Sequence, residues 1–207
     1  MGKSNRRLLL VAVSEGGPPL VHAILSQLRD EFPVPIIVCP IFRLDSIKPL
    51  CNAWNKTTRL SVKTVKETTD LLPGSVYVVP YGFTGRIEDS PCTISLVLNP
   101  AEKEKGQDAF VQILISAGKV FGEQLNVVLA GDMVNGVESM SAGLETVYEL
   151  RGRLYSVSEH GERISPGLEL IVKNGIGIQF ISADELVMKL YAWCGWADPV
   201  RSRYDKV

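Results

Sequence analysis

Apolar positions along this chain follow two patterns, one typical of buried strands and one typical of helices. Short apolar runs of the kind found in strands covered on both faces occur at residues 7–13, 35–39, 75–80 and 125–130. Helical patterns follow at residues 18–28, 46–54, 109–121, 137–150 and 183–194. This alternation of strands and helices predicts a largely parallel sheet with helices on both faces.

The middle of the chain departs from this alternation. Residues 60–65 alternate as a half-buried strand, and residues 84–88 and 93–98 predict two antiparallel strands within an excursion near residues 75–98. A strand at residues 153–157 and a short helix at residues 166–173 follow later. We therefore predict an α/β fold with three αβα layers, in which a mostly parallel, doubly wound sheet carries an antiparallel hairpin excursion. The 207 residues are expected to form a single domain with its core at about residues 7–195.

Composition narrows the function classes. The net charge is −1 with acidic and basic residues mixed throughout, so we expect no nucleic-acid partner and no membrane insertion. The four cysteines contain no Cys-x-x-Cys pair, which argues against a disulfide or zinc framework. We expect a cytoplasmic protein with reduced thiols, no metal site and no cofactor.

Two glycine-rich turns follow predicted strands, at Ser14-Glu15-Gly16-Gly17 and at Gly131-Asp132-Met133-Val134-Asn135-Gly136. Because parallel strands end at one edge of a sheet, we expect both turns to line a crevice there. Glycines allow close backbone approach, and the amides that open a helix can hold an anion or a developing oxyanion. Neither turn fits a dinucleotide fingerprint or a P-loop. Ser14 is the candidate nucleophile.

Several passages of the chain, taken in order, match the motifs of one known family. They are Val13-Ser14-Glu15-Gly16-Gly17, Ile36-Ile37-Val38, Leu60-Ser61-Val62-Lys63, residues 71–82, residues 127–136 and the loop at residues 158–167. In this order they resemble the chemotaxis receptor methylesterase family, the catalytic domain of CheB. The resemblance extends from about Arg7 to Leu190. It implies the family's fold and its reaction, which is hydrolysis of glutamyl methyl esters on chemoreceptors by a Ser-His-Asp triad, often with glutamine deamidation.

Of the triad, the resemblance carries over only the serine, at Ser14. The family's histidine position falls on Cys39 or Pro40, and we assign it to Pro40, which has no titratable group. Asn135 holds the aspartate position, and its amide carries no charge to stabilise an imidazolium. The family's enzymes usually carry a receiver domain, which we expect this chain to lack.

Two acidic residues change the electrostatics that the resemblance implies. Glu15 replaces the threonine after the nucleophile, and Asp132 replaces a methionine near the oxyanion hole. Either carboxylate would oppose the negative charge of a tetrahedral intermediate. The residues expected to bind at the crevice are Glu15, Gly16, Gly17, Asp132, Met133 and His160.

The two histidines leave alternatives open. His160 could act as the base for Ser14, whereas His22 is expected to be a surface or capping residue. We favour a non-catalytic binding or regulatory protein that contacts a chemoreceptor or another signalling protein. The alternatives are an active methylesterase or deamidase acting through Ser14, and a small-anion-binding module that uses the two glycine turns. The sequence leaves the oligomeric state open.

Overall fold

The computed structural model describes residues 6–43, 46–100, 108–133, 137–158 and 166–196 of the chain. The strands are β1 (Leu8–Val13), β2 (Ile36–Pro40), β3 (Ser61–Thr64), β4 (Thr69–Asp70), β5 (Ser75–Val78), β6 (Phe83–Asp89), β7 (Ile94–Pro100), β8 (Leu125–Ala130), β9 (Arg153–Val157) and β10 (Gln179–Ile181). The helices are α1 (Gly17–Gln27), α2 (Lys48–Thr57), α3 (Asp108–Phe121), the 3₁₀ turn η1 (Gly122–Gln124), α4 (Val137–Glu149), α5 (Pro166–Lys173) and α6 (Ala183–Trp193).

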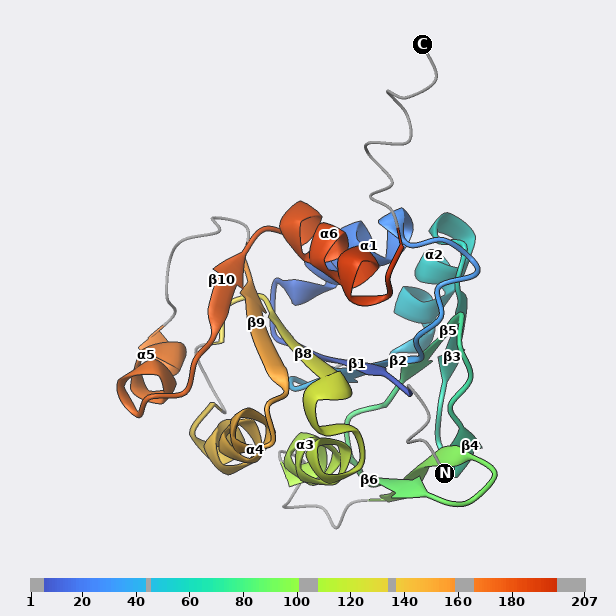
Figure 1. Ribbon diagram of the computed structural model, residues 1–207. Coiled ribbons are helices and arrows are strands. Elements are labelled where there is room, and N and C mark those ends of the chain that lie inside the picture. Colours follow the sequence, from blue (N-terminus) through green and yellow to red (C-terminus); the bar gives the residue numbers. More distant parts are fainter. Residues whose placement is uncertain (1–5, 44–45, 101–107, 134–136, 159–165, 197–207) are drawn as a thin grey trace.

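Seven strands form one sheet in the order β10-β9-β8-β1-β2-β5-β3, and every neighbouring pair in it is parallel. The chain passes from β1 toward β2 and β5, and it later returns to the other side of β1 at β8 (Figure 1). The switch point of the sheet therefore lies between β1 and β8. In such sheets, ligands bind in the crevice at the carboxyl ends of the strands that flank this point.

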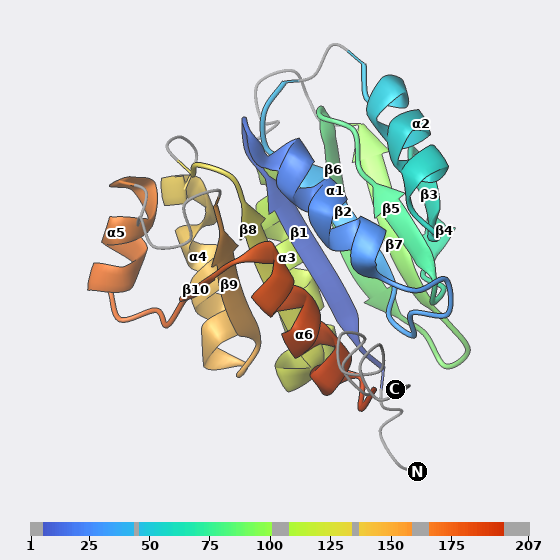
Figure 2. The same cartoon turned by 90° about the horizontal axis from the view of Figure 1, so that it is seen from above.

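Helices cover both faces of the sheet (Figures 1 and 2). α1, α2 and α6 lie on one face, and α3 and α4 lie on the other, where the antiparallel β4-β7-β6 sheet packs against α3. Side chains alternate along β1, so Leu8 and Leu10 belong to one core while Leu9 and Val11 belong to the other. Because both faces are covered, β1 has a continuous apolar sequence instead of an alternating one.

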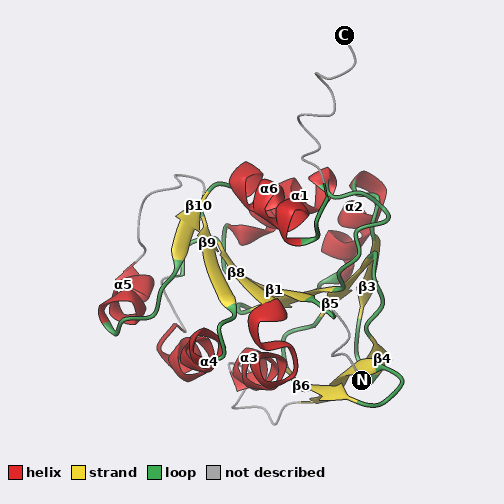
Figure 3. Cartoon of the chain, viewed as in Figure 1, coloured by secondary structure: helices red, strands yellow, loops and turns green. Residues whose placement is uncertain are grey.

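The predicted fold class is confirmed, with helical layers on either side of a mostly parallel sheet (Figure 3). The antiparallel excursion is also present. Its hairpin is formed by β6 and β7, and the short β4 pairs with β7 as a third strand. β5, which we placed in the excursion, instead pairs in parallel with β2 and β3 inside the main sheet. The strands β4 and β10 and the turn η1 were not predicted, since elements of two or three residues are too short to show a period. None of the described helices is long and apolar enough to cross a membrane.

A side chain from α2 caps the outer edge of the sheet at β3. The Asn55 amide donates to the Val62 carbonyl at 2.7 Å and accepts from the Val62 N–H at 2.9 Å. The Thr64 hydroxyl donates to the Cys51 thiol at 3.3 Å. Asn55 thus occupies backbone groups that an added strand would otherwise pair with, which protects an exposed sheet edge.

Candidate active site

Ser14 directly follows β1, at the switch point of the sheet. The residue is buried, with 6% of its surface exposed. Its backbone N–H donates to the Ala130 carbonyl at 3.0 Å, which continues the pairing of β1 with β8 by one residue. The apolar run of β1 therefore places Ser14 at the carboxyl edge of the sheet, where open α/β folds carry their chemistry.

The Ser14 hydroxyl lies against backbone acceptors. Its Oγ is 3.2 Å from the Glu15 carbonyl oxygen and 3.2 Å from the Ala130 carbonyl oxygen. A carbonyl oxygen accepts the hydroxyl's hydrogen bond but cannot remove its proton as an imidazole can. Within the described residues, the Ser14 hydroxyl is therefore directed to the backbone and is not paired with a general base. Sequence reasoning missed the Ala130 carbonyl, because a backbone acceptor has no signature in the sequence.

The two glycine turns are in contact, as the sequence predicts. A Cβ on Gly131 would lie 2.5 Å from Ser14 Oγ and 2.8 Å from the Gly17 nitrogen. A Cβ on Gly17 would lie 2.4 Å from the Ala130 carbonyl oxygen. Gly131 also has a φ of 95°, in the left-handed region that favours glycine. Any side chain at Gly17 or Gly131 would therefore push the turns after β1 and β8 apart.

The amino end of α1 offers few free amides. The Gly17 N–H donates to the Ser14 carbonyl at 2.9 Å, and Pro18 and Pro19 have no N–H. The first three residues of α1 therefore supply no free donor to an anion or oxyanion. Our expectation that the amides opening this helix could hold an anion fails at these three positions. The two prolines already carry that signal in the sequence.

The acidic residues and the methionine of the turns occupy different environments. Glu15 and Asp132 are exposed, so their charges face solvent on the edge that carries the turns. Such charges oppose the formation of an oxyanion and favour a cationic or N–H-bearing group. Met133, which we expected to bind ligand, is fully buried in the core on the α3 and α4 face. Its side chain therefore packs inside the protein and does not form an exposed crevice wall.

Pro40 is the last residue of β2 and pairs with Val13 in the register of the sheet. Pro40 therefore lies on the strand next to β1, opposite the residue that precedes Ser14, and it is buried. His22 lies on α1 and points toward α2, since its Nε2 is 2.8 Å from the Thr57 hydroxyl. The described histidine is thus engaged on the helical layer and takes no part in the Ser14 hydrogen bonds.

Two predicted site residues, Asn135 and His160, lie outside the described residues. Cys39, beside Pro40, is buried, and burial raises the pKa of its thiol far above the usual range. It is therefore a neutral thiol and cannot act as a base for Ser14 at neutral pH. Among the residues whose placement is described, no group of three or more His, Cys, Asp and Glu side chains could hold a metal ion.

The fold and the serine turn together define a parallel α/β domain with a serine directly after a central strand, at the carboxyl edge of its sheet. The chain belongs to the CheB methylesterase family, whose family model matches residues 9–153. The matched span contains Ser14, Pro40 and both glycine turns.

Relatives of known sequence agree with this assignment. The chain is 32% identical over 146 residues to protein-glutamate methylesterase/protein-glutamine glutaminase 1 of Carboxydothermus hydrogenoformans, which covers 69% of this chain and 43% of that protein. It is 26% identical over 192 residues to the protein of the same name from Oleidesulfovibrio alaskensis, covering 91% of this chain and 51% of that protein. The chain therefore spans about half the length of the curated relatives it matches.

A solved structure shares the fold. The CheB methylesterase catalytic domain of Thermotoga maritima matches with a TM-score of 0.75 at 19% sequence identity. The match covers 89% of this chain and 97% of that structure. The three-layer arrangement around the switch point is therefore that of a CheB catalytic domain.

Proposed function

We propose that this chain is a catalytically impaired member of the CheB methylesterase family, acting as a binding or regulatory module in a cytoplasmic chemosensory system. The observation that carries the proposal is the Ser14 hydroxyl, whose two acceptors are backbone carbonyl oxygens 3.2 Å away. Its partner is a chemoreceptor or another signalling protein, which family membership and the names of the relatives support.

The missing base decides how fast Ser14 can attack an ester. A serine hydroxyl is a weak nucleophile at neutral pH unless a neighbouring base takes its proton. Removing members of a serine triad lowers turnover by roughly 10⁴–10⁶. Pro40 has no group that accepts a proton, and the Cys39 thiol is neutral because burial raises its pKa. Hydrolysis through Ser14 is therefore expected to be roughly 10⁴–10⁶ slower than in a family member with a complete triad.

Methanol release from a methylated chemoreceptor fragment tests this proposal. Hydrolysis of the glutamyl methyl ester consumes water and yields a carboxylate and methanol. We expect the wild-type chain to release methanol no faster than Ser14→Ala, while a catalytically active family member serves as the positive control. Fast release that is lost in Ser14→Ala would contradict impairment. It would support the alternative of an active methylesterase whose base lies outside the described residues.

A repaired chain makes the same test sharper. Pro40→His combined with Asn135→Asp restores the residue types that the resemblance assigns to the triad. If the missing base alone limits the wild-type chain, the repaired chain releases methanol and loses that activity when Ser14→Ala is added. A repaired chain that stays silent would place the loss beyond the base, for example in the amides that Pro18 and Pro19 remove from α1.

The binding part of the proposal has its own measurement. Isothermal titration of the chain with the receptor fragment, in methylated and unmethylated forms, reports binding without requiring chemistry. Reversing the exposed charges with Glu15→Lys and Asp132→Lys is expected to change the affinity if the partner meets the edge that carries Ser14. No heat of binding to either form would exclude the chemoreceptor as the partner.

A further inference from the structure

A concave surface lies at the amino ends of β1 and β8, opposite to the edge that carries Ser14. A groove of about 930 Å³ opens there between the turn after β6, the end of α3, η1 and the end of α4. A smaller groove of about 260 Å³ adjoins it. Arg6, Ile94 and Phe121 line both grooves, so the two form one continuous surface, which we call the amino-edge surface.

Prolines and other apolar residues form most of the smaller groove. Pro33, Pro35, Pro73 and Leu72 line it, and Leu72 is 56% exposed. An exposed leucine among prolines can cover an apolar side chain of a ligand at little cost in conformational entropy, because the proline rings are already fixed. This half of the surface therefore suits one apolar side chain.

Cationic side chains outnumber carboxylates around the two grooves. Arg6, Arg7, Lys119 and Arg151 line the amino-edge surface, against the carboxylates of Asp89 and Glu123. Arg6 binds Asp89 at 2.7 Å, whereas Lys119 and Arg151 form no ion pair within the described part of the chain. The exposed cations at the end of α3 and the end of α4 are therefore available to an anionic group.

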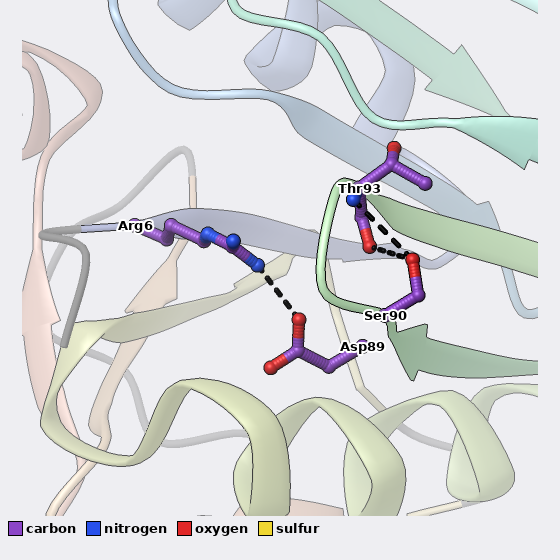
Figure 4. Close-up of polar contacts among 4 residues, drawn as sticks. All are labelled: Arg6, Asp89, Ser90 and Thr93. Carbon is purple, nitrogen blue, oxygen red and sulfur yellow. Dashed lines mark hydrogen bonds and ion pairs between the residues drawn. The ribbon is translucent and has the colours of Figure 1, made fainter. Parts of the chain in front are cut away.

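The wall of the larger groove is held in place by polar contacts (Figure 4). Arg6 reaches from the residue pair before β1 to Asp89 at the end of β6, beside the turn that leads into β7. In that turn, the Ser90 hydroxyl donates to the Thr93 carbonyl at 2.9 Å, and the Thr93 N–H donates to Ser90 Oγ at 3.3 Å. These contacts form the groove wall before any ligand arrives.

Two further features of the larger groove concern Gln124 and Arg151. Gln124 Oε1 is shielded from solvent and has no hydrogen-bond partner among the residues that the structure describes. A turn of its amide toward the groove would let it accept from an N–H group of a ligand. Arg151 has a φ of 63° because it lies in the turn that ends α4, where its N–H donates to the Tyr148 carbonyl and the Gly152 N–H donates to the Val147 carbonyl. This turn places the Arg151 cation in the lining of the groove.

We propose that the amino-edge surface binds an extended segment of a partner protein in which carboxylate side chains lie next to an apolar side chain. The carboxylates pair with Lys119 and Arg151, a backbone N–H meets Gln124, and the apolar side chain covers Leu72 and the prolines. The larger groove holds three cations, Arg6, Lys119 and Arg151, beside the carboxylates of Asp89 and Glu123. This small excess of positive charge suits a segment with one or two carboxylates better than the dense negative charge of a nucleic acid. This inference does not depend on whether Ser14 is active.

The test uses an array of blocked hexapeptides in which acidic positions (Asp or Glu) and apolar positions (Leu or Phe) vary independently. The fluorescently labelled chain is applied to the array to find the peptides that it retains. The best peptide is then labelled itself and titrated with unlabelled chain, and the rise in its fluorescence polarisation gives the affinity. We expect the retained peptides to carry both residue types and to bind more weakly as salt is added. The pair Lys119→Glu and Arg151→Glu is expected to weaken binding roughly tenfold.

A matched variant controls for the overall change in charge. Arg59→Glu with Lys63→Glu makes the same reversal on exposed residues outside both grooves, and it should leave the affinity unchanged. Leu72→Ser should weaken binding of peptides with an apolar residue, and Ser14→Ala should have no effect. Circular dichroism melts verify that each variant folds.

Three results would overturn the inference. The first is an array on which no peptide is retained above background. The second is an affinity that falls equally for the two charge-reversal pairs, which would mean that binding follows net charge only. The third is tighter binding of short single-stranded DNA than of the best peptide, which would assign the surface to nucleic acid.

Discussion

Alanine at Gly131 tests how closely the two glycine turns approach each other. Two separate costs apply to this variant. The φ of 95° places the new side chain in the left-handed region, at a cost of about 1–2 kcal/mol. The new Cβ would also lie 2.5 Å from Ser14 Oγ and 2.8 Å from the Gly17 nitrogen. Separating the turns should cost about 1–3 kcal/mol, as overpacking does. We therefore expect Gly131→Ala to lower the free energy of unfolding by about 2–5 kcal/mol.

Two neighbouring glycines separate these costs. Gly16 has a φ of 80° and no atom within 4 Å of an added Cβ, so Gly16→Ala should lose only the backbone cost of about 1–2 kcal/mol. An added Cβ at Gly17 meets the Ala130 carbonyl oxygen at 2.4 Å. Gly17→Ala should therefore show the steric cost, less up to about 1 kcal/mol gained from helix propensity.

Urea denaturation followed by tryptophan fluorescence measures the three free energies of unfolding, with the slope against urea expected to stay constant. The predicted order of destabilisation places Gly131→Ala above Gly16→Ala by at least about 1 kcal/mol. Equal losses for these two variants would refute the reasoning, because they would mean that the turn after β8 does not press against Ser14 and Gly17.

Three further predictions concern positions away from the Ser14 turn. Arg151→Gly should raise the free energy of unfolding by about 1 kcal/mol, since its φ of 63° suits glycine, and a lower melting temperature would contradict this. Asn55→Ala should lower the melting temperature, because the Val62 N–H and carbonyl lose their side-chain partners. The uncovered sheet edge should also shift the chain toward larger species in size-exclusion chromatography. Elution and melting like those of the wild type would refute this prediction. Burial raises the pKa of Cys194 from 9.0 to about 11, so iodoacetamide should modify Cys194 more slowly than the exposed Cys92 near neutral pH, and equal rates would disagree with this. The folded chain holds this thiol proton more tightly than the unfolded chain, so the stabilising contribution is full below about pH 9 and is lost as the pH rises through about 11.

Most elements of the fold could be predicted because their patterns are long. The strand that ends at Val13 is a continuous apolar run, and β8 is apolar except at Asn126. The bounds of both strands agree with the sequence prediction to within a residue. The pairing of β5 was harder to predict, because a short apolar run is compatible with a strand of a parallel sheet and with a strand of a hairpin. Its parallel pairing with β2 and β3 depends on contacts between segments far apart in the chain.

The candidate site also has parts that the sequence predicts and parts that it does not. The position of Ser14 after β1 and the meeting of two glycine turns follow from strand ends in a parallel sheet. The hydrogen bonds of the Ser14 hydroxyl do not, because the sequence carries no signal for a backbone acceptor such as the Ala130 carbonyl. Met133 shows the opposite error: its place in a turn motif suggested binding, whereas its apolar side chain is buried in the core.

The amino-edge surface could not be predicted at all. Arg6, Asp89 and Arg151 are separated by long stretches of chain, and each has the sequence context of an ordinary surface residue. Only the packing of β1 beside β8, with the β6–β7 turn and the end of α4 at their amino ends, brings these charges to one groove. The net charge of −1 gives no sign of this local excess of cations, because acidic residues elsewhere in the chain balance it.

The central claim is that the Ser14 hydroxyl has no base to activate it, and its reaction with a fluorophosphonate measures this most directly. Such a reagent forms a bond to an activated serine oxygen and releases fluoride, which adds a fixed mass to the chain. Intact-mass spectrometry is expected to find the wild-type chain as unreactive as Ser14→Ala, while a catalytically active family member is labelled. A stoichiometric adduct that appears on the wild-type chain and disappears in Ser14→Ala would contradict the claim.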